Sequence, residues 1–484
     1  MARIVLGYLA VWLLTAVGCT KANPAATCAD GTCSDPAFPF CDVDGSVSGE
    51  PGACVAITCQ AGANGGCQGS AVLVCNADGT SFDPMPCANG CDPNSGCNSC
   101  VPGTTQCSGS KLRTCGSDAV FADTETCEST CTQAPTPHCA YLSPKYVPDA
   151  CDVPTPGTAL TIAGNATVDS SVDNNCTGGV VVQAGGPDIC VMHYDTVSVS
   201  SGATLTFIGT RAVALVADHE AKVSGTIEVG ATAGASGPGG GTYESGGLTL
   251  VGGIHANAGS GDGGAGFRTG GGAGGNGTVD GGTGNGGSAS PDPATLPAFF
   301  GGPFAGHGGG GGGALTIISC RSTLSVLGTL DSRGGGGVGG RVNTTTTQSP
   351  YAGSAGGAGG YVVLQGLAVT VTGQTFANGG GGGAGNDQGY TPVMFNGLDG
   401  TASDIVCARG GIAPPGAGAG GDGGCAMVSQ PGDGHHPSDS TARPGGGGGS
   451  MGFFQSYTPA GVTPTLVPAH ASPGFQPNLT VETR

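Results

Sequence analysis

The stretch "VLGTLDSRGGGG", residues 326–337, decides the fold class of most of this 484-residue chain. It holds an apolar residue, a glycine two positions later, a second apolar residue two positions after that, and then a run of glycines. The same pattern recurs as "TIAGNATV" (161–168), "VSGTIEV" (223–229), "LVGGIHAN" (250–257) and "VTGQTFAN" (371–378). Apolar positions that alternate along the chain are typical of a β-strand, and the glycine between them is typical of a bend.

The five copies align on Gly164, Gly225, Gly252, Gly328 and Gly373, and their spacing varies from 27 to 76 residues. Aliphatic strands at 212–217, 314–319 and 361–366 precede several copies. Stacked strands with glycine corners and few helix formers predict a parallel β-solenoid over residues 157–484. The chain is therefore predicted to be all-β, with large glycine-rich insertions between the coils of the solenoid.

The insertions are the glycine runs, such as residues 307–314 and 378–384. Two structures compete for them: flexible surface loops, or extended left-handed polyglycine strands that pack side by side. The second structure requires glycine because no Cβ fits between such close backbones. The runs restart directly after the strand motifs, and the sequence leaves both structures open.

The first third of the chain is rich in cysteine, with sixteen cysteines from Cys28 to Cys139. Residues 67–91 and 107–131 repeat the same intervals of 8, 12 and 4 residues. Such density predicts disulfides in an exported protein, and each four-cysteine module is expected to be a β-hairpin held by two bridges. The pairing cannot be deduced from the spacing. Candidate disulfide cysteines are Cys67, Cys75, Cys87, Cys91, Cys107, Cys115, Cys127, Cys131, Cys176, Cys190, Cys407 and Cys425.

The remaining cysteines allow further expectations. Residues 19–60 hold a short cysteine module, residues 61–139 the tandem repeats, and residues 140–156 a proline-rich linker that Cys139 and Cys151 are expected to close. Cys320 has no evident partner nearby. "CNSC" at Cys97 to Cys100 offers thiolates for zinc or redox chemistry, but exported thiols oxidise, so disulfides are favoured.

The N-terminus predicts export. Residues 1–18 are expected to form a signal peptide, since they hold one positive residue and an apolar stretch too short to span a bilayer. "TAVGC", ending at Cys19, resembles the lipobox of bacterial lipoproteins, although Ala16 stands where that family usually has Leu. Acylation of Cys19 leaves an even number of cysteines, 22 of 23, for pairing. The alternative is an ordinary signal peptide, after which Cys19 joins the disulfides.

The whole pattern resembles the glycine-rich, cysteine-rich predicted secreted lipoproteins of myxobacteria, which join cysteine modules to "VxGTIxANGG" tracts. That group carries no established function to transfer. No other apolar run approaches membrane length, so a lipid is expected to be the only membrane attachment. Thr20 follows Cys19 where Asp could stand, which resembles the outer-membrane sorting class of lipoproteins and implies an outer-membrane or cell-surface location. The net charge of −19 with four lysines disfavours nucleic acid. We expect a structural or adhesive, non-catalytic protein without a cofactor, whose partner is a glycan, extracellular matrix or a cell-surface protein.

The alternative is a carbohydrate-active β-helix enzyme, a polysaccharide lyase or hydrolase. The position three residues after the aligned glycine holds Glu228, His255 and Asp331, which are expected to share one outward column, and glycosidic cleavage needs such clustered carboxylates. An outward column that is merely polar explains them equally. His435, His436 and Asp439 are candidate metal ligands, or a solvated loop. A calcium-stabilised passive scaffold is a third hypothesis.

Overall fold

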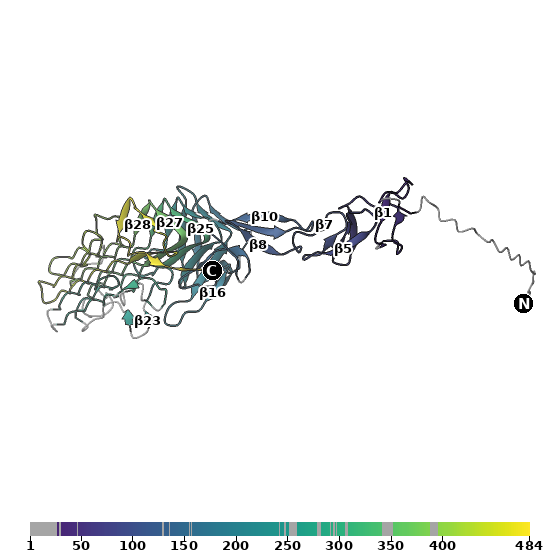
Figure 1. The fold of residues 1–484 in the computed structure, drawn as a ribbon. Coiled ribbons are helices and arrows are strands. Elements are labelled where there is room, and N and C mark those ends of the chain that lie inside the picture. Colours follow the sequence, from purple (N-terminus) through teal and green to yellow (C-terminus); the bar gives the residue numbers. More distant parts are fainter. Residues whose placement is uncertain are drawn as a thin grey trace, which may run out of the picture. The chain divides into compact units, whose positions relative to one another are not determined.

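The computed structural model of the chain describes these residues: 27–28, 31–45, 47–127, 130–134, 136–153, 155, 157–241, 243–245, 248–250, 259–277, 282–290, 292–293, 296, 298–304, 308–340, 352–387 and 395–484. The chain forms two compact units, one of Met1–Gln106 with Leu112–Thr124 and the other of Cys107–Lys111 with Glu125–Arg484. Within the described residues the secondary structure is β-strand with short 3₁₀ turns, such as η1 (Asp173–Asn175), and no α-helix is present there. The predicted all-β fold is therefore confirmed (Figure 1).

The first cysteine module is a small antiparallel pair. Its strands are β1 (Phe40–Asp42) and β2 (Ala53–Val55), in which Cys41 lies opposite Cys54. Two disulfides, Cys28 to Cys41 and Cys33 to Cys54, attach the preceding segment to these strands. A pair this short buries little apolar surface, so the bridges supply most of its order.

Each tandem repeat is a three-stranded antiparallel sheet followed by a small strand pair. The expected hairpin is present, and a strand that precedes it completes the sheet. The first repeat contains β3 (Asn64–Gln68), β4 (Ala71–Cys75), β5 (Phe82–Pro86), β6 (Cys91–Asp92) and β7 (Gly96–Cys97). The second contains β8 (Thr105–Ser108), β9 (Lys111–Cys115), β10 (Phe121–Thr126), β11 (Cys131–Thr132) and β12 (His138–Cys139).

Six cysteines, and not four, form the disulfide unit of each repeat. In both repeats the first cysteine bonds to the third, the second to the fifth and the fourth to the sixth. The bridges are Cys59–Cys75, Cys67–Cys91 and Cys87–Cys97, then Cys100–Cys115, Cys107–Cys131 and Cys127–Cys139. The expectation of two bridges within each four-cysteine grid was wrong, because flanking segments fold back onto the hairpin. The Cys75 N–H, for example, donates to the carbonyl of Ala63.

The second unit is built on a parallel β-solenoid of six coils, in which the strands form three columns. The first column contains β17 (Ile189–Tyr194), β20 (Ala212–Ala217), the first half of β25 (Ala314–Val326), the first half of β27 (Tyr361–Val371) and β29 (Phe453–Thr458). The second contains β14 (Ala159–Ile162), β18 (Thr196–Val199), β21 (Ala221–Val223), the later halves of β25 and β27, and β30 (Thr465–Leu466). The third contains β15 (Ala166–Asp169), β19 (Thr204–Ile208), β22 (Thr226–Glu228), β26 (Thr329–Asp331), β28 (Gln374–Phe376) and β31 (His470–Ser472).

The core of the solenoid consists of ladders of identical positions. Val199, Val223, Val326 and Val371 pair in successive coils of the second column, and all four are buried. The glycines of four sequence copies lie at the corner between the second and third columns, as predicted. A Cβ on Gly328 would lie 1.8 Å from the carbonyl oxygen of the preceding corner glycine, so the stacking itself requires glycine there.

The number of coils differs from the number of sequence copies. Ala203 and Ala469 take the corner position in two coils that the glycine alignment missed, since the residues after them pair with the third column. The copy at Gly252 adds no coil, because β22 pairs directly with β26. Its Leu250 belongs to β24 (Leu248–Leu250), which pairs antiparallel with β23 (Tyr243–Ser245); Gly252 itself lies outside the described residues.

Further short strands complete the second unit. β16 (Gly179–Val181) pairs antiparallel with β17, and β32 (Leu479–Thr480) pairs in parallel with β29. At the end of the chain, β33 (Glu482–Thr483) pairs antiparallel with β13 (Leu142–Ser143). The last residues therefore pair with the segment that precedes the solenoid.

The glycine runs form an ordered bundle of extended strands, which resolves the alternative left open by the sequence. Residues 379–385 show the pattern, because their backbone N–H groups donate hydrogen bonds to three neighbouring segments in turn. The N–H groups of Gly379, Gly382 and Gly385 donate to Gly424, Gly421 and Gly418; those of Gly380 and Gly383 donate to Gly357 and Ser354; and those of Gly381 and Ala384 donate to Leu398 and Phe395. A period of three residues is that of the polyproline II helix, so these runs are polyglycine helices packed side by side.

At many of its contacts the bundle leaves no room for a Cβ. A Cβ on Gly380 would lie 2.0 Å from the carbonyl oxygen of Gly335, and one on Gly385 would lie 1.9 Å from that of Arg443. The helices gain their order from hydrogen bonds between neighbours, which offset the backbone entropy that glycine loses on folding. In Figure 1 these helices form a lattice of thin traces beside β27 and β28.

The segment expected to be a linker is part of the second unit's core. Leu142 and Val147 are buried, and the Tyr146 ring stacks on Phe299 with centroids 5.0 Å apart. Cys151 bonds to Cys320, and Cys139 bonds to Cys127. The expected closure of this segment by Cys139 and Cys151 was therefore wrong, because the segment lies on the solenoid and does not close on itself.

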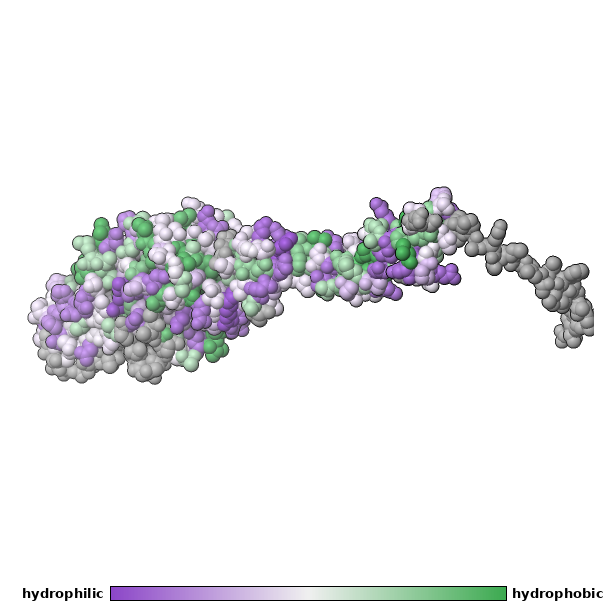
Figure 2. Space-filling model, in the orientation of Figure 1, coloured by the Kyte–Doolittle hydropathy of each residue, from purple (hydrophilic) through white to green (hydrophobic). Residues whose placement is uncertain are grey.

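The surface of the second unit is mixed in polarity. Large exposed apolar side chains include Ile405, Val406, Ile412, Met427 and Val428, all within the turns and outer helices of the polyglycine bundle. On the face drawn in Figure 2 the apolar residues are interspersed with polar ones. The bundle therefore presents small apolar areas between polar side chains.

Candidate functional site

The carboxylates of the predicted column do lie on neighbouring coils. Glu228, at the end of β22, pairs in register with Asp331, at the end of β26. Thr206, on the preceding coil, donates a hydrogen bond of 3.3 Å from its hydroxyl to Glu228 Oε2. His255 lies outside the described residues, and the direct pairing of β22 with β26 places no third-column strand between the two carboxylates.

Asp331 is engaged by an arginine from its own coil. The Nε of Arg333 donates to both carboxylate oxygens, at 2.6 and 2.7 Å, and Arg333 Nη1 donates to the carbonyl of Gly400 at 2.8 Å. Burial lowers the pKa of Arg333, but the hydrogen bond and charge of Asp331 outweigh burial, so the pKa is raised overall. A carboxylate whose two oxygens both accept from one guanidinium is stabilised as an ion pair, which opposes its use as an acid or nucleophile.

The expectation of an outward column was wrong for the later coils. Asp331 is only 5% exposed, and the next position in the column, Phe376, is buried as well. Residues 396–400 of the bundle come back beside this edge, and Gly400 accepts the arginine hydrogen bond there. The alternation of apolar residues predicted the strand faces correctly, but it carried no information about a distant segment that covers one face, such as Gly400, which is 67 residues after Arg333.

A buried histidine–aspartate pair connects the segment before the solenoid to its coils. His193 Nε2 lies 2.9 Å from Asp218 Oδ1, and Arg321 Nη1 lies 3.3 Å from the same oxygen. The N–H and hydroxyl of Thr155 both donate to Asp218 Oδ2. Burial raises the pKa of Asp218, whereas the hydrogen bonds from His193 and Thr155 lower it more, so the pKa falls below its ordinary value. The cluster is a buried ion-pair network.

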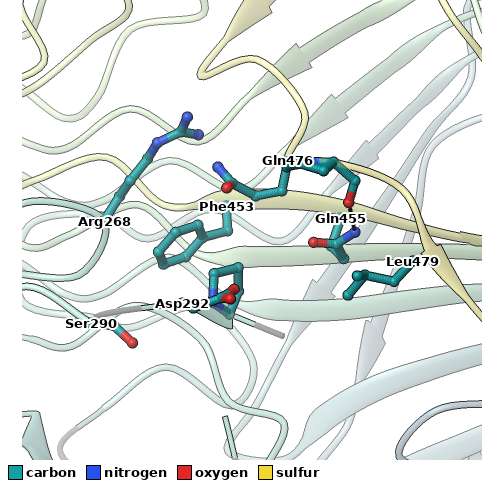
Figure 3. Close-up of a pocket in the computed structure, with 9 residues that line it drawn as sticks. Arg268, Ser290, Asp292, Phe453, Gln455, Gln476 and Leu479 are labelled. Carbon is teal, nitrogen blue, oxygen red and sulfur yellow. Dashed lines mark hydrogen bonds between the residues drawn. The ribbon is translucent and has the colours of Figure 1, made fainter. Parts of the chain in front are cut away.

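A polar pocket of about 480 Å³ lies between the polyglycine bundle, β29 and the C-terminal segment. Figure 3 shows the charged side chains Arg268 and Asp292 and the carboxamides of Gln455 and Gln476 around it. The remaining walls consist of Ser290, Pro293, Phe453, Pro477 and Leu479. None of these residues was a candidate in the sequence analysis, because they come from four separate segments. The one feature that could have been noticed in the sequence is an isolated arginine, Arg268, in a glycine-rich stretch.

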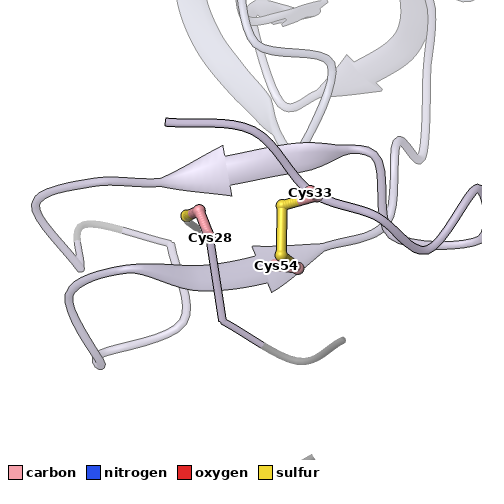
Figure 4. Close-up of side chains that lie close together, drawn as sticks. All are labelled: Cys28, Cys33 and Cys54. Carbon is pink, nitrogen blue, oxygen red and sulfur yellow. A yellow bond between two sulfur atoms is a disulfide. The ribbon is translucent and has the colours of Figure 1, made fainter. Parts of the chain in front are cut away.

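Close groups of metal-ligating atoms in the described residues contain cysteines that form disulfides. Figure 4 shows Cys28, Cys33 and Cys54 together; Cys33 bonds to Cys54 and Cys28 to Cys41. The other group joins His193 and Asp218 to Cys320, which bonds to Cys151. A disulfide sulfur is no longer a thiolate, so these groups are not thiolate metal sites.

The other sequence candidates for metal or redox chemistry are separated. Cys97 bonds to Cys87 and Cys100 to Cys115, so the "CNSC" pair is the boundary between two repeats, and the zinc and redox hypotheses for it are wrong. His435 and His436 are exposed, and His436 Nδ1 accepts from the N–H of Asn276 at 2.6 Å. Asp439 accepts from the hydroxyl and N–H of Thr441, and the described metal-ligating groups do not include it.

All twelve candidate disulfide cysteines are bonded in the structure. Cys176 pairs with Cys190 and Cys407 with Cys425, each bridge closing a local loop. In total, eleven disulfides use 22 cysteines of the 23 in the chain, and the one left over is Cys19, which lies outside the described residues.

No protein-family model, curated protein or solved structure matches this chain. Among the described residues, none forms a helix with the length and apolar character needed to span a bilayer.

Proposed function

We propose that this chain is an exported bacterial lipoprotein, attached to the membrane through acylated Cys19, with a structural or adhesive role at the cell surface. The observation that carries the proposal is the cysteine pairing. Eleven disulfides are the mark of an oxidising compartment, and they use every cysteine of the chain except Cys19. A cysteine that these eleven bridges do not use, at the end of a lipobox-like segment, fits acylation, which would consume its thiol.

The architecture of the second unit supports a structural or adhesive role. Stacked coils and polyglycine helices make a repetitive body that exposes both polar and apolar side chains, and such repetitive surfaces suit contact with extended partners. Glycan, matrix or another cell-surface protein are the partners proposed. The ion pair of Asp331 with Arg333 counts against the polysaccharide-cleaving alternative at the predicted column.

The experiment follows the full-length chain in a bacterial host that processes lipoproteins. Wild-type protein should partition with membranes and gain the mass of acyl chains, and Cys19→Ser should lose both while keeping eleven disulfides. An Ala16→Leu variant is the matched control, since it brings the segment closer to the lipobox and should remain acylated. Wild-type protein that carries no acyl mass and holds Cys19 in a mixed disulfide would refute the anchor.

The adhesive role has its own test. Cells that display the wild-type chain should attach to immobilised glycans or matrix more than cells with Cys19→Ser, which release the protein. Equal attachment of the two strains at equal expression would remove adhesion and leave a structural role.

A further inference from the structure

The pocket beside β29 contains an arginine, Arg268, for which the described residues supply no carboxylate partner. Arg268 is half-buried, and its guanidinium Cζ lies 5.9 Å from the centre of the Phe453 ring. Nη1 donates to the carbonyl of Gly474 at 3.1 Å, and the Gln476 side-chain oxygen, oriented toward the guanidinium, accepts from Nη1 and Nη2 at 3.2 and 3.0 Å. These contacts use three of its five N–H groups, which leaves the Nε and one Nη2 proton, the pair that forms a fork for a carboxylate.

The lack of a nearby carboxylate distinguishes Arg268 from Arg211, Arg321 and Arg333, which are also half-buried. Arg211, Arg321 and Arg333 each lie within 4 Å of an aspartate, whereas no such carboxylate reaches Arg268 among the described residues. Burial lowers the pKa of Arg268, and no neighbouring charge opposes this effect. Buried charges in proteins are normally paired, so the site is complementary to an anion from outside the chain.

A buried hydroxyl on the same pocket also lacks a partner. Ser290 is 3% exposed, and its Oγ makes no hydrogen bond among the described residues although it lines the cavity. Buried polar atoms nearly always have a hydrogen-bond partner. A hydroxyl group of a ligand would supply the partner that Ser290 lacks among the described residues. Figure 3 shows Ser290 and Arg268 on the same side of the pocket, with Gln455 and Leu479 on the other.

The rest of the lining defines the shape and chemistry of the ligand. Carboxamides of Gln455 and Gln476 and the carboxylate of Asp292 suit hydroxyl groups, and Pro293, Pro477 and Leu479 suit an apolar ring face. A volume of about 480 Å³ lies within the range of small-molecule pockets, roughly 300–1,000 Å³. The ligand is therefore a small ring that carries both a carboxylate and several hydroxyls.

We propose that this pocket binds an acidic sugar, with its carboxylate on the Arg268 fork and a hydroxyl on Ser290. Uronic acids and sialic acids share this chemistry. The inference rests on the proposed adhesive role, because it names the glycan that the surface would recognise. It adds a binding site built from the bundle, β29 and the C-terminal segment.

The test is calorimetric titration of the purified full-length chain with galacturonate, glucuronate and N-acetylneuraminate, alongside galactose and the methyl ester of galacturonate. We expect at least one acid to bind about tenfold or more tightly than its neutral counterpart, since a charged hydrogen-bonded pair is worth that much. Which acid binds distinguishes the two sugar classes. Arg268→Gln should weaken binding by about tenfold or more, and Arg409→Gln, which alters an exposed arginine, should leave it unchanged.

Ser290→Ala keeps the test decisive if Arg268→Gln impairs folding. Removal of an unpaired buried hydroxyl should leave the melting temperature equal or higher, while the acidic sugar binds more weakly. The proposal is overturned if no acid binds, if the ester binds as well as the acid, or if Ser290→Ala and Arg268→Gln bind like wild type. Cells that still attach to immobilised glycan through the Arg268→Gln protein would keep the adhesive role and remove this pocket from it.

Discussion

Cys151 is bonded to Cys320, 169 residues later in the chain, and this bridge attaches the segment before the solenoid to strand β25 of the fourth coil. The same segment binds the coils through Asp218 and pairs with the last strand of the chain, β33. Its proline-rich sequence suggested a spacer, yet in the folded protein it is a structural element of the second unit.

The long bridge should contribute more stability than a short one. Replacing both Cys151 and Cys320 with Ala should lower the free energy of unfolding by about 4–5 kcal/mol, because a cross-link over a long loop restricts the unfolded chain most. The paired change at Cys407 and Cys425, which closes only 18 residues, should cost about 3 kcal/mol. Urea unfolding followed by circular dichroism measures both, and equal losses would contradict the loop-length argument.

The polyglycine bundle should reject even one methyl group. Gly380→Ala places a Cβ where the Gly335 carbonyl oxygen now lies, 2.0 Å away, and should lower the free energy of unfolding by about 1–3 kcal/mol or more. Gly164→Ala is the matched control, since its Cβ would meet nothing within 4 Å. Thermal melts of the two variants compare them, and an unchanged Gly380→Ala melt would mean that the bundle is loosely packed.

The disulfide pattern of the repeats can be read by peptide mapping without reduction. We expect Cys97 to be linked to Cys87 and Cys100 to Cys115, with no peptide that joins Cys97 to Cys100. Chelators should leave the melting temperature of the protein unchanged if thiolates hold no zinc there. A Cys97–Cys100 link, or free thiols at both positions, would reopen the redox or metal hypothesis.

The Asp218 network should make stability depend on pH in one direction. Because its pKa in the folded state is depressed below the ordinary 3.8, Asp218 contributes stability above about pH 4 and loses the contribution as pH falls through the lower folded value. Asp218→Asn should therefore cost about 3 kcal/mol at pH 7, and the difference from wild type should shrink toward pH 3. Chemical unfolding at several pH values measures this difference.

Asp173→Asn provides the comparison for that experiment. Asp173 forms an ion pair with Arg211 at 2.7 Å, but its side chain is 78% exposed, so its loss should cost less than about 1 kcal/mol at any pH. If the Asp218→Asn deficit stayed constant from pH 7 to pH 3, the loss would come from packing and not from charge.

Much of the fold could be predicted because it repeats. Alternating apolar residues around Gly225, Gly328 and Gly373 fix strand faces and corners locally, and stacking then follows from the need to bury them. Two coils were missed because Ala203 and Ala469 stand where the pattern has glycine. The copy at Gly252 was counted as a coil although it adds none, since a local motif does not show whether its strand joins the solenoid.

The candidate sites were less predictable, because each depends on segments far apart in the chain. Glu228 and Asp331 were expected to be neighbours, and they pair in register. However, Asp331 is ion-paired by Arg333, and residues 396–400 return to cover it. The pocket around Arg268 combines residues from β29, the bundle and the last ten residues of the chain. No spacing rule links such positions.

The sequence by itself determined the all-β class, the stacking of coils and the oxidised state of the cysteines, because short-range alternation, glycine corners and cysteine density each act over a few residues. Only the tertiary structure decided the disulfide partners, the order of the glycine runs and the composition of the pocket. Those features arise where distant backbones come into contact, and a glycine without a side chain carries no local signal of which neighbour its N–H will meet.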